Sequence, residues 1–218
     1  MNIQWIAHSC FKITLENGTE LLFDPFDSYI GYEMPALHAD IVLISHEHED
    51  HNCLRNIEGD FALVKGPGKW DVKGVRIEGF ETCHDHSGGA HRGKNTVFKV
   101  EADNMSVVHL GDLGCIPGDD FFEKLGEVDI LCVPVGGNYT IDAQEAFEVC
   151  KRIEPNIILP MHYKTLFLKL DVAPVYACTD LASDYYDRSR LGRSSFSIDA
   201  AGKKKRTRII ILENSLDC

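Results

Sequence analysis

A dense group of histidines and a carboxylate marks one short stretch of the chain. His46 and His48 lie two positions apart, so both imidazoles can face one ion, and Asp50 and His51 follow and can turn toward a second ion. The group comes directly after residues 39–44, an apolar stretch rich in β-branched side chains that predicts a buried strand. Sites in α/β folds are built where strands end. Because imidazole and carboxylate suit zinc, manganese or iron better than calcium, this segment predicts a transition-metal site.

The spacing His46-x-His48-x-Asp50-His51 resembles the signature of the metallo-β-lactamase superfamily. Further motifs of that family follow in the same order along the chain: His84 in Glu81-Thr82-Cys83-His84, then Gly111-Asp112, then Pro160-Met161-His162-Tyr163. Near the N-terminus, His8-Ser9-Cys10 and Phe23-Asp24-Pro25-Phe26 resemble the branch related to L-ascorbate-6-phosphate lactonase. These motifs cover residues 1–165, and the remainder carries no motif that we recognise.

The resemblance implies an α/β fold, a four-layer αββα sandwich with two metal ions at one edge. The first ion would take His46, His48 and His84, the second would take Asp50, His51 and His162, and Asp112 would bridge the two. The second histidine of the signature is not a glutamate, so the chain departs from the di-iron flavoprotein variant of the superfamily. We therefore expect two divalent ions, zinc first, with manganese or iron as alternatives.

Such a centre would need no nucleophilic side chain. Two ions that share a water lower its pKa toward neutrality and polarise the bond under attack. No Gly-x-Ser-x-Gly motif is present, which agrees with this chemistry. Asp50, as a ligand that can also hold a proton, and Asp112, as the bridge, are the predicted catalytic residues.

Several supporting roles stay open at this stage. His84 and His86 compete for one ligand position, and the family pattern favours His84. Asp24 is a candidate acceptor for the far nitrogen of a ligand histidine, with a plain turn carboxylate as the alternative. His8 lines the floor of the site or is a satisfied core histidine, and His109 belongs to a strand and is not expected to be a ligand.

Substrate contacts are predicted from residues beside the metal motifs. Asn138, in a loop after a buried strand, is a candidate donor to a developing oxyanion. Tyr163 and Lys164 follow His162 and are candidates for an anionic group of the substrate. The loop after His84 offers Arg92 and Lys94 for the same task.

Length and charge narrow the class of protein. At 218 residues the sequence predicts a single domain over residues 1–218, and its formal net charge of −12 disfavours nucleic acid as a partner. The sequence shows neither a leader-like segment nor a membrane span, so we expect a cytoplasmic protein without a membrane partner.

We expect the eight cysteines to be reduced thiols, and Cys10, Cys83 and Cys115 lie near the motifs. A homo-oligomer remains open.

Apolar periodicity places strands early and strand–helix units late. Strands are predicted at residues 1–6, 10–15, 20–23, 39–44, 61–64, 75–80, 96–100, 106–110, 129–133, 156–159 and 207–212. Helices are predicted at residues 52–57, 119–125 and from a Thr140 cap to residue 153. The basic residues 203–206 predict a solvated turn.

These observations favour a metal-dependent hydrolase of a small anionic ester or lactone, with a small-molecule substrate as its partner. A phosphodiesterase or nuclease of the same superfamily is the first alternative. A metal-holding binding protein without turnover is the second.

Overall fold

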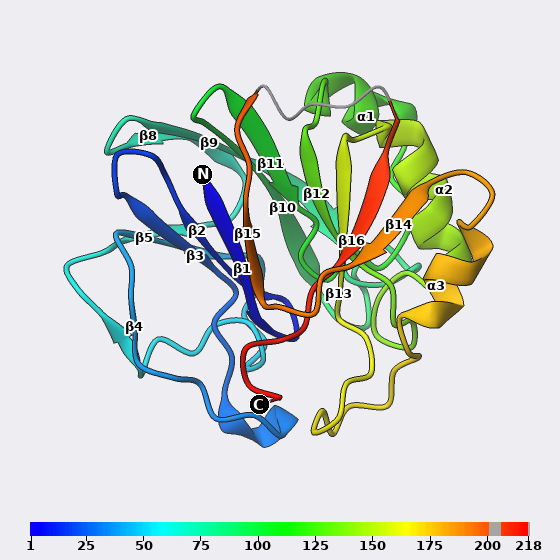
Figure 1. The fold of residues 1–218 in the computed structure, drawn as a ribbon, viewed down its shortest axis with the longest axis horizontal. Helices are drawn as coiled ribbons and strands as arrows, with labels where there is room; N and C mark the ends of the chain where they lie inside the picture. The colour runs from blue at the N-terminus through cyan, green and yellow to red at the C-terminus, as the bar shows by residue number, and fades with distance from the viewer. Residues whose placement is uncertain (201–205, 218) are drawn as a thin grey trace.

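The computed structural model describes residues 1–200 and 206–217, and two sheets packed face to face dominate it (Figure 1). The first sheet has six strands in the order β15-β1-β2-β3-β5-β7. Its strands are β1 (Asn2–Ala7), β2 (Cys10–Thr14), β3 (Glu20–Phe23), β5 (Ile41–Ile44), β7 (Ala62–Lys65) and β15 (Ser195–Ser197). The neighbours β3, β5 and β7 run parallel, whereas β1 and β2 form an antiparallel hairpin.

The second sheet has eight strands in the order β14-β16-β13-β12-β11-β10-β9-β8. Its strands are β8 (Gly68–Val72), β9 (Val75–Cys83), β10 (Lys94–Ala102), β11 (Met105–His109), β12 (Ile130–Pro134), β13 (Ile157–Met161), β14 (Asp187–Arg190) and β16 (Arg208–Ile211). The strands β11, β12 and β13 are parallel to one another, while β8 to β11 form an antiparallel meander. A small third pair joins β4 (Leu37–His38) to β6 (Ile57–Glu58).

Both faces of the first sheet are buried, and the side chains of β5 show how. Ile41 and Leu43 point into the core between the two sheets, whereas Val42 and Ile44 point to a second apolar cluster on the outer face. Successive strand residues face opposite sides, so a strand covered on both sides needs an unbroken apolar run. This explains why the sequence before the histidine group is uniformly apolar.

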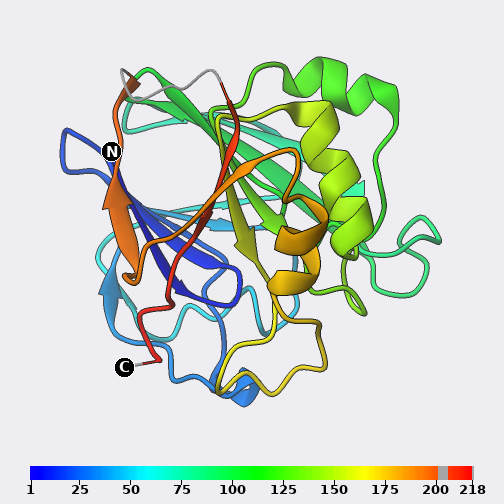
Figure 2. The same cartoon turned by 45° about the vertical axis from the view of Figure 1, so that its right-hand side comes forward.

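The helices cover the outer face of the second sheet (Figure 2). They are α1 (Asp119–Leu125), α2 (Ala143–Ile153) and α3 (Tyr176–Leu181). Helix α2 begins with a capping box, in which the Asp142 side chain accepts from the Glu145 amide and the Glu145 side chain accepts from the Asp142 amide. The helix buries Phe147 and Val149. The predicted α/β sandwich is confirmed. Its outer layer over the first sheet is made of loops and the short 3-10 helix η1 (Ser28–Ile30), whose Ile30 joins the second apolar cluster.

Several local predictions were wrong. No helix forms over residues 52–57, where turns lead into β6. The helical pattern there is weak, and the amides of Cys53 and Ile57 donate instead to the carbonyls of Pro25 and Leu54. Helix α2 is capped by Asp142 and not by Thr140, whose hydroxyl instead donates to the carbonyl of Ile141. The strands β8, β14 and β15 and helix α3 had not been predicted. The basic run 203–206 lies outside the described residues except for its last member.

No helix in residues 1–200 or 206–217 is both long enough and apolar enough to cross a membrane.

Candidate metal centre

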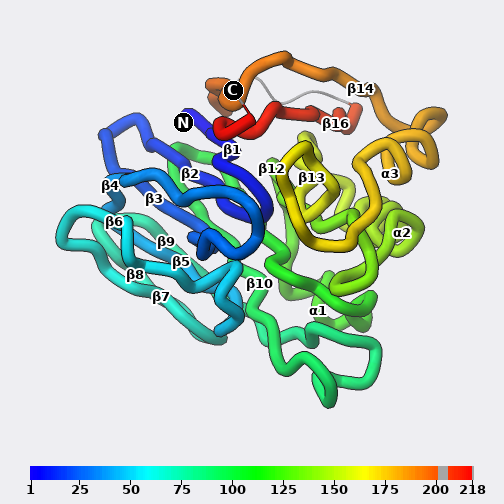
Figure 3. Tube along the Cα trace, turned by 90° about the horizontal axis from the view of Figure 1, so that it is seen from below, coloured from blue at the N-terminus to red at the C-terminus, as the bar shows by residue number. Residues whose placement is uncertain are grey.

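Six strands point their C-terminal ends to one edge of the sandwich, and the predicted metal ligands and their neighbours His8 and Asp24 follow those ends. His8 follows β1, Asp24 follows β3 and residues 45–51 follow β5, all in the first sheet. From the second sheet come His84 after β9, Asp112 after β11 and His162 after β13. Figure 3 views this edge from below, with the connecting loops toward the reader. The site is therefore built where the two sheets meet, from segments far apart in the sequence.

The backbone turns sharply at several of these positions. His8, Asp24 and His162 all have positive φ, of 54°, 45° and 52°, a region that non-glycine residues seldom adopt. Such conformations cost of order 1–3 kcal/mol each and persist where the surroundings enforce them, which is typical of functional sites. Gly111 also has positive φ, and a Cβ there would lie 2.3 Å from Asn95 Oδ1, so only glycine fits before Asp112.

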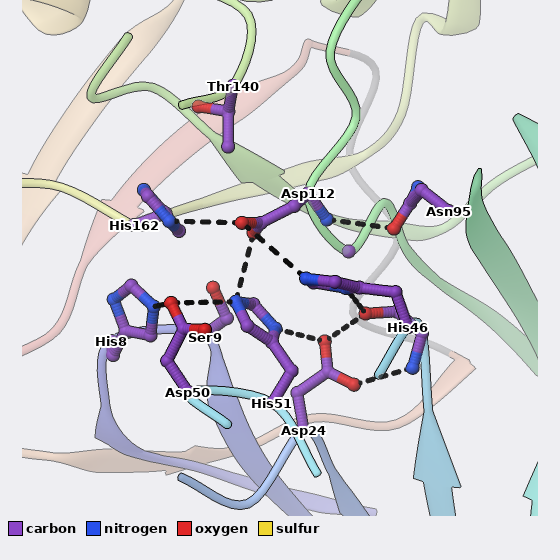
Figure 4. Close-up of polar contacts among 12 residues, drawn as sticks. His8, Ser9, Asp24, His46, Asp50, His51, Asn95, Asp112, Thr140 and His162 are labelled. Atoms are coloured by element: carbon purple, nitrogen blue, oxygen red, sulfur yellow. Dashed lines mark hydrogen bonds and ion pairs between the residues drawn. The ribbon is translucent and has the colours of Figure 1, made fainter. Parts of the chain in front are cut away.

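Asp112 lies at the centre of the site (Figure 4). Its Oδ1 is 3.2 Å from Nε2 of His51, and its Oδ2 is 3.2 Å from Nε2 of both His84 and His162. The Nε2 of His46 is 4.0 Å from the same Oδ2. One buried carboxylate therefore faces imidazoles from both predicted ligand sets, as a bridging position requires.

The surrounding side chains fall into two groups beside this carboxylate. His46, His48 and His84 place ligand atoms within 4.8 Å of one another, and so do His8, Asp50, His51 and His162. A third set of the same kind joins Asp112 to His46 and His51. The structure thus brings together all seven predicted ligands and adds His8, whose Nε2 is 3.3 Å from Asp50 Oδ2.

Asp24 fixes the orientation of two imidazoles at once. Its Oδ2 accepts from Nδ1 of His51 at 2.9 Å and from the Ser45 hydroxyl at 2.7 Å, while its Oδ1 accepts from the Ser45 amide. Because the Ser45 hydroxyl gives its only proton to Asp24, it must accept from Nδ1 of His46 at 2.8 Å. Both histidines then carry a proton on Nδ1 and turn Nε2 toward Asp112, an assignment that rests on the hydrogen-bond network.

The main chain of Asp112 is held by Asn95. The Asn95 Oδ1 accepts from the Asp112 amide at 3.0 Å, and its Nδ2 donates to Thr82 and to the carbonyl of Leu110. Sequence reasoning missed this residue, because a lone asparagine within a strand carries no motif.

The residues fit divalent cations. Buried polar atoms without a hydrogen-bond partner are rare in proteins, yet they cluster here: Nε2 of His46, His51 and His162, and Oδ1 of Asp112. An imidazole nitrogen that faces a carboxylate at 3.2 Å needs a positive charge between the two, which a proton or a metal ion can supply. Imidazole and carboxylate without thiolate is the donor set of zinc, manganese or iron sites.

The electrostatics of the site point the same way. Burial lowers the pKa of His46 to about 3, assisted by His51, and burial lowers the pKa of His8 to about 4, so both imidazoles are neutral at pH 7. Burial also works against a charge on His51, but the carboxylates of Asp112, Asp50 and Asp24 outweigh it and raise its pKa. The pKa of Asp112 lies well below its ordinary range, because the imidazoles of His162 and His51 outweigh its burial. Without a metal ion, the three carboxylates therefore favour a proton on His51, and the same negative charge would attract a metal cation.

The histidines outside the two groups have other partners. His86 is exposed, with 65% of its side chain accessible, and its Nε2 pairs with Glu145 at 2.6 Å. His84, in contrast, is buried beside Asp112. His109 donates from Nε2 to the Ser9 carbonyl and accepts at Nδ1 from Gly111, so it is a satisfied core residue under the site.

A pocket of about 370 Å³ opens beside the cluster and reaches His48, Asp50, His84 and Asp112. Of the five predicted substrate contacts, Asn138, Tyr163 and Lys164 are not in its lining. Asn138 donates to the Asp171 carbonyl, Tyr163 is buried against Trp5, and Lys164 donates to the carbonyls of Leu168 and Leu170. Tyr163 and Lys164 had been predicted because they adjoin His162, but Tyr163 packs into the core and the Lys164 ammonium binds main-chain carbonyls.

Other side chains form the pocket wall instead. They are Tyr29 from η1, Arg92 from the loop between β9 and β10, Tyr139, Leu170, Glu47 and Glu49. Of these, Arg92 had been predicted, whereas Tyr29 and Leu170 had not, since nothing in residues 27–38 or 165–172 resembles a motif. Lys94 pairs with Glu81 and does not line the pocket.

Comparison with known proteins agrees with this geometry. Residues 2–162 match the family model described as the beta-lactamase superfamily domain, a span that includes every residue of the cluster, and the chain belongs to that superfamily. The narrower resemblance to L-ascorbate-6-phosphate lactonase stays a prediction.

Several relatives of this chain are named as metal-dependent hydrolases. A solved structure from Thermotoga maritima, which is assigned by name only as a Zn-dependent hydrolase of the metallo-β-lactamase superfamily, is 36% identical, covers 98% of this chain and 99% of its own, and has a TM-score of 0.80. UPF0173 metal-dependent hydrolases from Enterococcus faecalis and Thermoplasma acidophilum are 27% and 28% identical, over 73% and 77% of this chain and 84% and 85% of theirs. This chain is accordingly a metal-dependent hydrolase of the metallo-β-lactamase superfamily.

Proposed function

We propose that this protein hydrolyses a small anionic ester or lactone in the cytoplasm, with two divalent cations held around Asp112. The observation that carries the proposal is the contact of one buried carboxylate with imidazoles from both ligand groups, at the floor of a pocket of about 370 Å³. That volume suits a small molecule. The formal charge of −12 supports a partner other than nucleic acid or an anionic membrane.

Each ligand group fits one cation. His46, His48 and His84 would hold the first, and Asp50, His51 and His162 the second, with Asp112 shared. We expect zinc first, and manganese or iron as alternatives with the same donor preference. When bound, such a pair supplies a water that ionises near neutral pH and polarises the substrate oxygen.

Asp50 is suited to handle a proton in this reaction. Its carboxylate lines the pocket, lies 3.6 Å from Nε2 of His51, and is held on its other side by His8 at 3.3 Å. The Tyr29 hydroxyl lies close enough that burial and the Asp50 charge raise the Tyr29 pKa, so it stays a protonated donor facing the pocket. A carboxylate in this position can hold a water by hydrogen bonding and pass its proton to the leaving group.

The test is a substrate screen with defined metal content. The protein would be stripped with chelator, reloaded with zinc, manganese or iron, and assayed on matched panels of carboxylic esters, lactones and phosphodiesters. We expect metal-dependent turnover of esters or lactones that is lost in Asp112→Asn and kept in Asp60→Asn, a control at an exposed aspartate that belongs neither to the ligand groups nor to the pocket lining. Turnover of phosphodiesters alone would establish the first alternative. Metal binding without turnover of any panel would establish a binding protein.

A further inference from the structure

The pocket wall contains an arginine, Arg92, that forms no ion pair among the residues that the structure describes. Arg92 lies on residues 84–93, the loop that joins β9 to β10 and stands out from the two sheets (Figure 3). Its Cζ is 4.7 Å from the centroid of the Tyr139 ring, and both residues line the pocket together with His48 and His84. A guanidinium over an aromatic face is held in place by cation–π attraction while its edge stays free to bind.

The loop that carries Arg92 has a fixed shape. The Asp85 carboxylate accepts hydrogen bonds from four main-chain amides: Ser87 at 2.7 Å, Gly89 at 3.0 Å, His91 at 2.9 Å and Arg92 at 2.8 Å. Asp85 directly follows His84, so the same short segment places a ligand histidine and the arginine. Arg92 therefore approaches the pocket from a constrained loop.

The guanidinium lacks the usual protein partner. Within residues 1–200 and 206–217, no carboxylate forms an ion pair with Arg92, whereas the neighbouring Lys94 pairs with Glu81 at 3.2 Å. Among the acidic residues of the pocket, Glu47 pairs with Lys65 at 2.9 Å and Glu49 is exposed to solvent. A cation without a partner, in a pocket wall beside a hydrolytic centre, is available to a negatively charged ligand.

We propose that Arg92, held over Tyr139, binds the anionic group of the substrate and determines the preference for anionic over neutral esters. The proposal rests on the hydrolase function proposed above and names the residue that selects its substrate class. The group recognised is a planar or tetrahedral oxyanion, a carboxylate or a phosphate, since both accept two parallel N–H donors from a guanidinium. The substrate then spans the pocket, with its anion at Arg92 and its scissile bond toward Asp112.

Kinetics on a matched pair of esters tests this selection. The substrates are mono-4-nitrophenyl glutarate, which carries a free carboxylate, and its neutral methyl ester. Arg92→Met should lower kcat/KM at least about 10-fold on the anionic ester and less than about 2-fold on the neutral one, as expected for loss of a charge-assisted contact. Arg92→Lys should be intermediate, because it keeps the positive charge and loses the two parallel N–H donors of the guanidinium. Lys94→Met, which removes an equal charge two residues away, should leave the ratio unchanged. An equal fall on both esters in Arg92→Met would overturn the proposal.

Calorimetry provides a measurement that does not require turnover. Glutarate and inorganic phosphate would be titrated separately into the metal-loaded wild type and into Arg92→Met of equal metal content. The wild type should bind at least one of the two about 10-fold more tightly than the variant, and the two titrations tell carboxylate from phosphate. If no ester is hydrolysed but this difference is seen, the esterase proposal fails and the anion site stands. Equal affinities in the two proteins, or no binding by the wild type, would contradict the anion site.

Discussion

The carboxylate of Asp24 accepts a hydrogen bond from Nδ1 of His51 at 2.9 Å, and this contact leaves Nε2 of His51 facing Asp112. Asp24 touches neither the pocket nor Asp112, yet it sets the tautomer of His51 and, through Ser45, that of His46. One buried carboxylate after β3 therefore orients one imidazole in each proposed ligand group.

Replacing Asp24 should weaken metal binding without removing a ligand. In Asp24→Asn the amide can donate as well as accept, so the Nδ1–H of His51 and the Ser45 hydroxyl lose their charged acceptor. We expect metal affinity to fall about 10–100-fold, as is typical when the partner of a ligand histidine is lost. Competition titration against a chromogenic chelator measures this affinity, with Asp60→Asn as the matched surface control. Wild-type affinity in Asp24→Asn would show that the hydrogen bond has no such role.

The two candidate histidines of the loop after β9 should behave differently. His84→Ala removes a buried imidazole 3.2 Å from Asp112, so we expect loss of metal from the first group and of activity. His86→Ala removes an exposed side chain paired with Glu145, so metal content and activity should stay within about 2-fold of wild type, since exposed ion pairs contribute little. Metal analysis and kinetics of both variants decide between them. A greater loss of metal and activity in His86→Ala would mean that His86, and not His84, faces the metal site.

Asp50 should affect the rate more than the fold. Asp50→Asn keeps an oxygen ligand and the shape of the side chain but removes its charge and its ability to take a proton. We expect kcat to fall about 10²-fold or more, the lower range of general acid–base contributions, while the melting temperature changes little. Wild-type kcat should rise with pH as the water ionises and then level off. A wild-type rate in Asp50→Asn of unchanged metal content would remove Asp50 from the mechanism.

The stability of the metal-free protein should depend on the protonation of His109. Burial, the largest cause, lowers the pKa of His109 in the folded protein, so the unfolded chain binds more protons just below the ordinary histidine pKa. Stability from this residue is therefore present at pH 7 and is lost as the pH falls below about 6.5, by up to about 1.4 kcal/mol per pH unit. His109→Gln, which can still donate to the Ser9 carbonyl, should flatten the pH dependence of the unfolding free energy between pH 7 and pH 5. Urea denaturation at several pH values measures it, and an unchanged slope would contradict this account.

The strands and the metal-binding segments could be predicted from sequence because each leaves a local pattern. The apolar run of β5 is continuous since both its faces are buried, and the histidine spacing after it is dense enough to indicate chemistry. Whether His84 or His86 faces Asp112 depends on the tertiary structure. The resemblance to the family, and not the local residue pattern, indicated His84.

The pocket wall was harder to predict because its parts come together only in three dimensions. Tyr29 and Leu170 lie 141 positions apart in sequence (170 − 29) in segments without motifs, yet both line the pocket. Lys164 and Tyr163 were predicted there because they follow His162, but Tyr163 is buried against Trp5 and Lys164 donates to main-chain carbonyls. Asn95, which positions Asp112 through its amide, is likewise visible only once β10 and β11 are paired.

The measurement that tests the central claim most directly is the position of metal in crystals of the protein purified without chelator. Anomalous diffraction at the absorption edge of the metal found by elemental analysis should give two peaks per chain, one among His46, His48 and His84 and one among Asp50, His51 and His162, with Asp112 between them. The loaded protein should also melt at a higher temperature than the stripped one. No peak in this cluster, together with no metal-induced rise in melting temperature, would contradict the binuclear centre and the hydrolytic mechanism built on it.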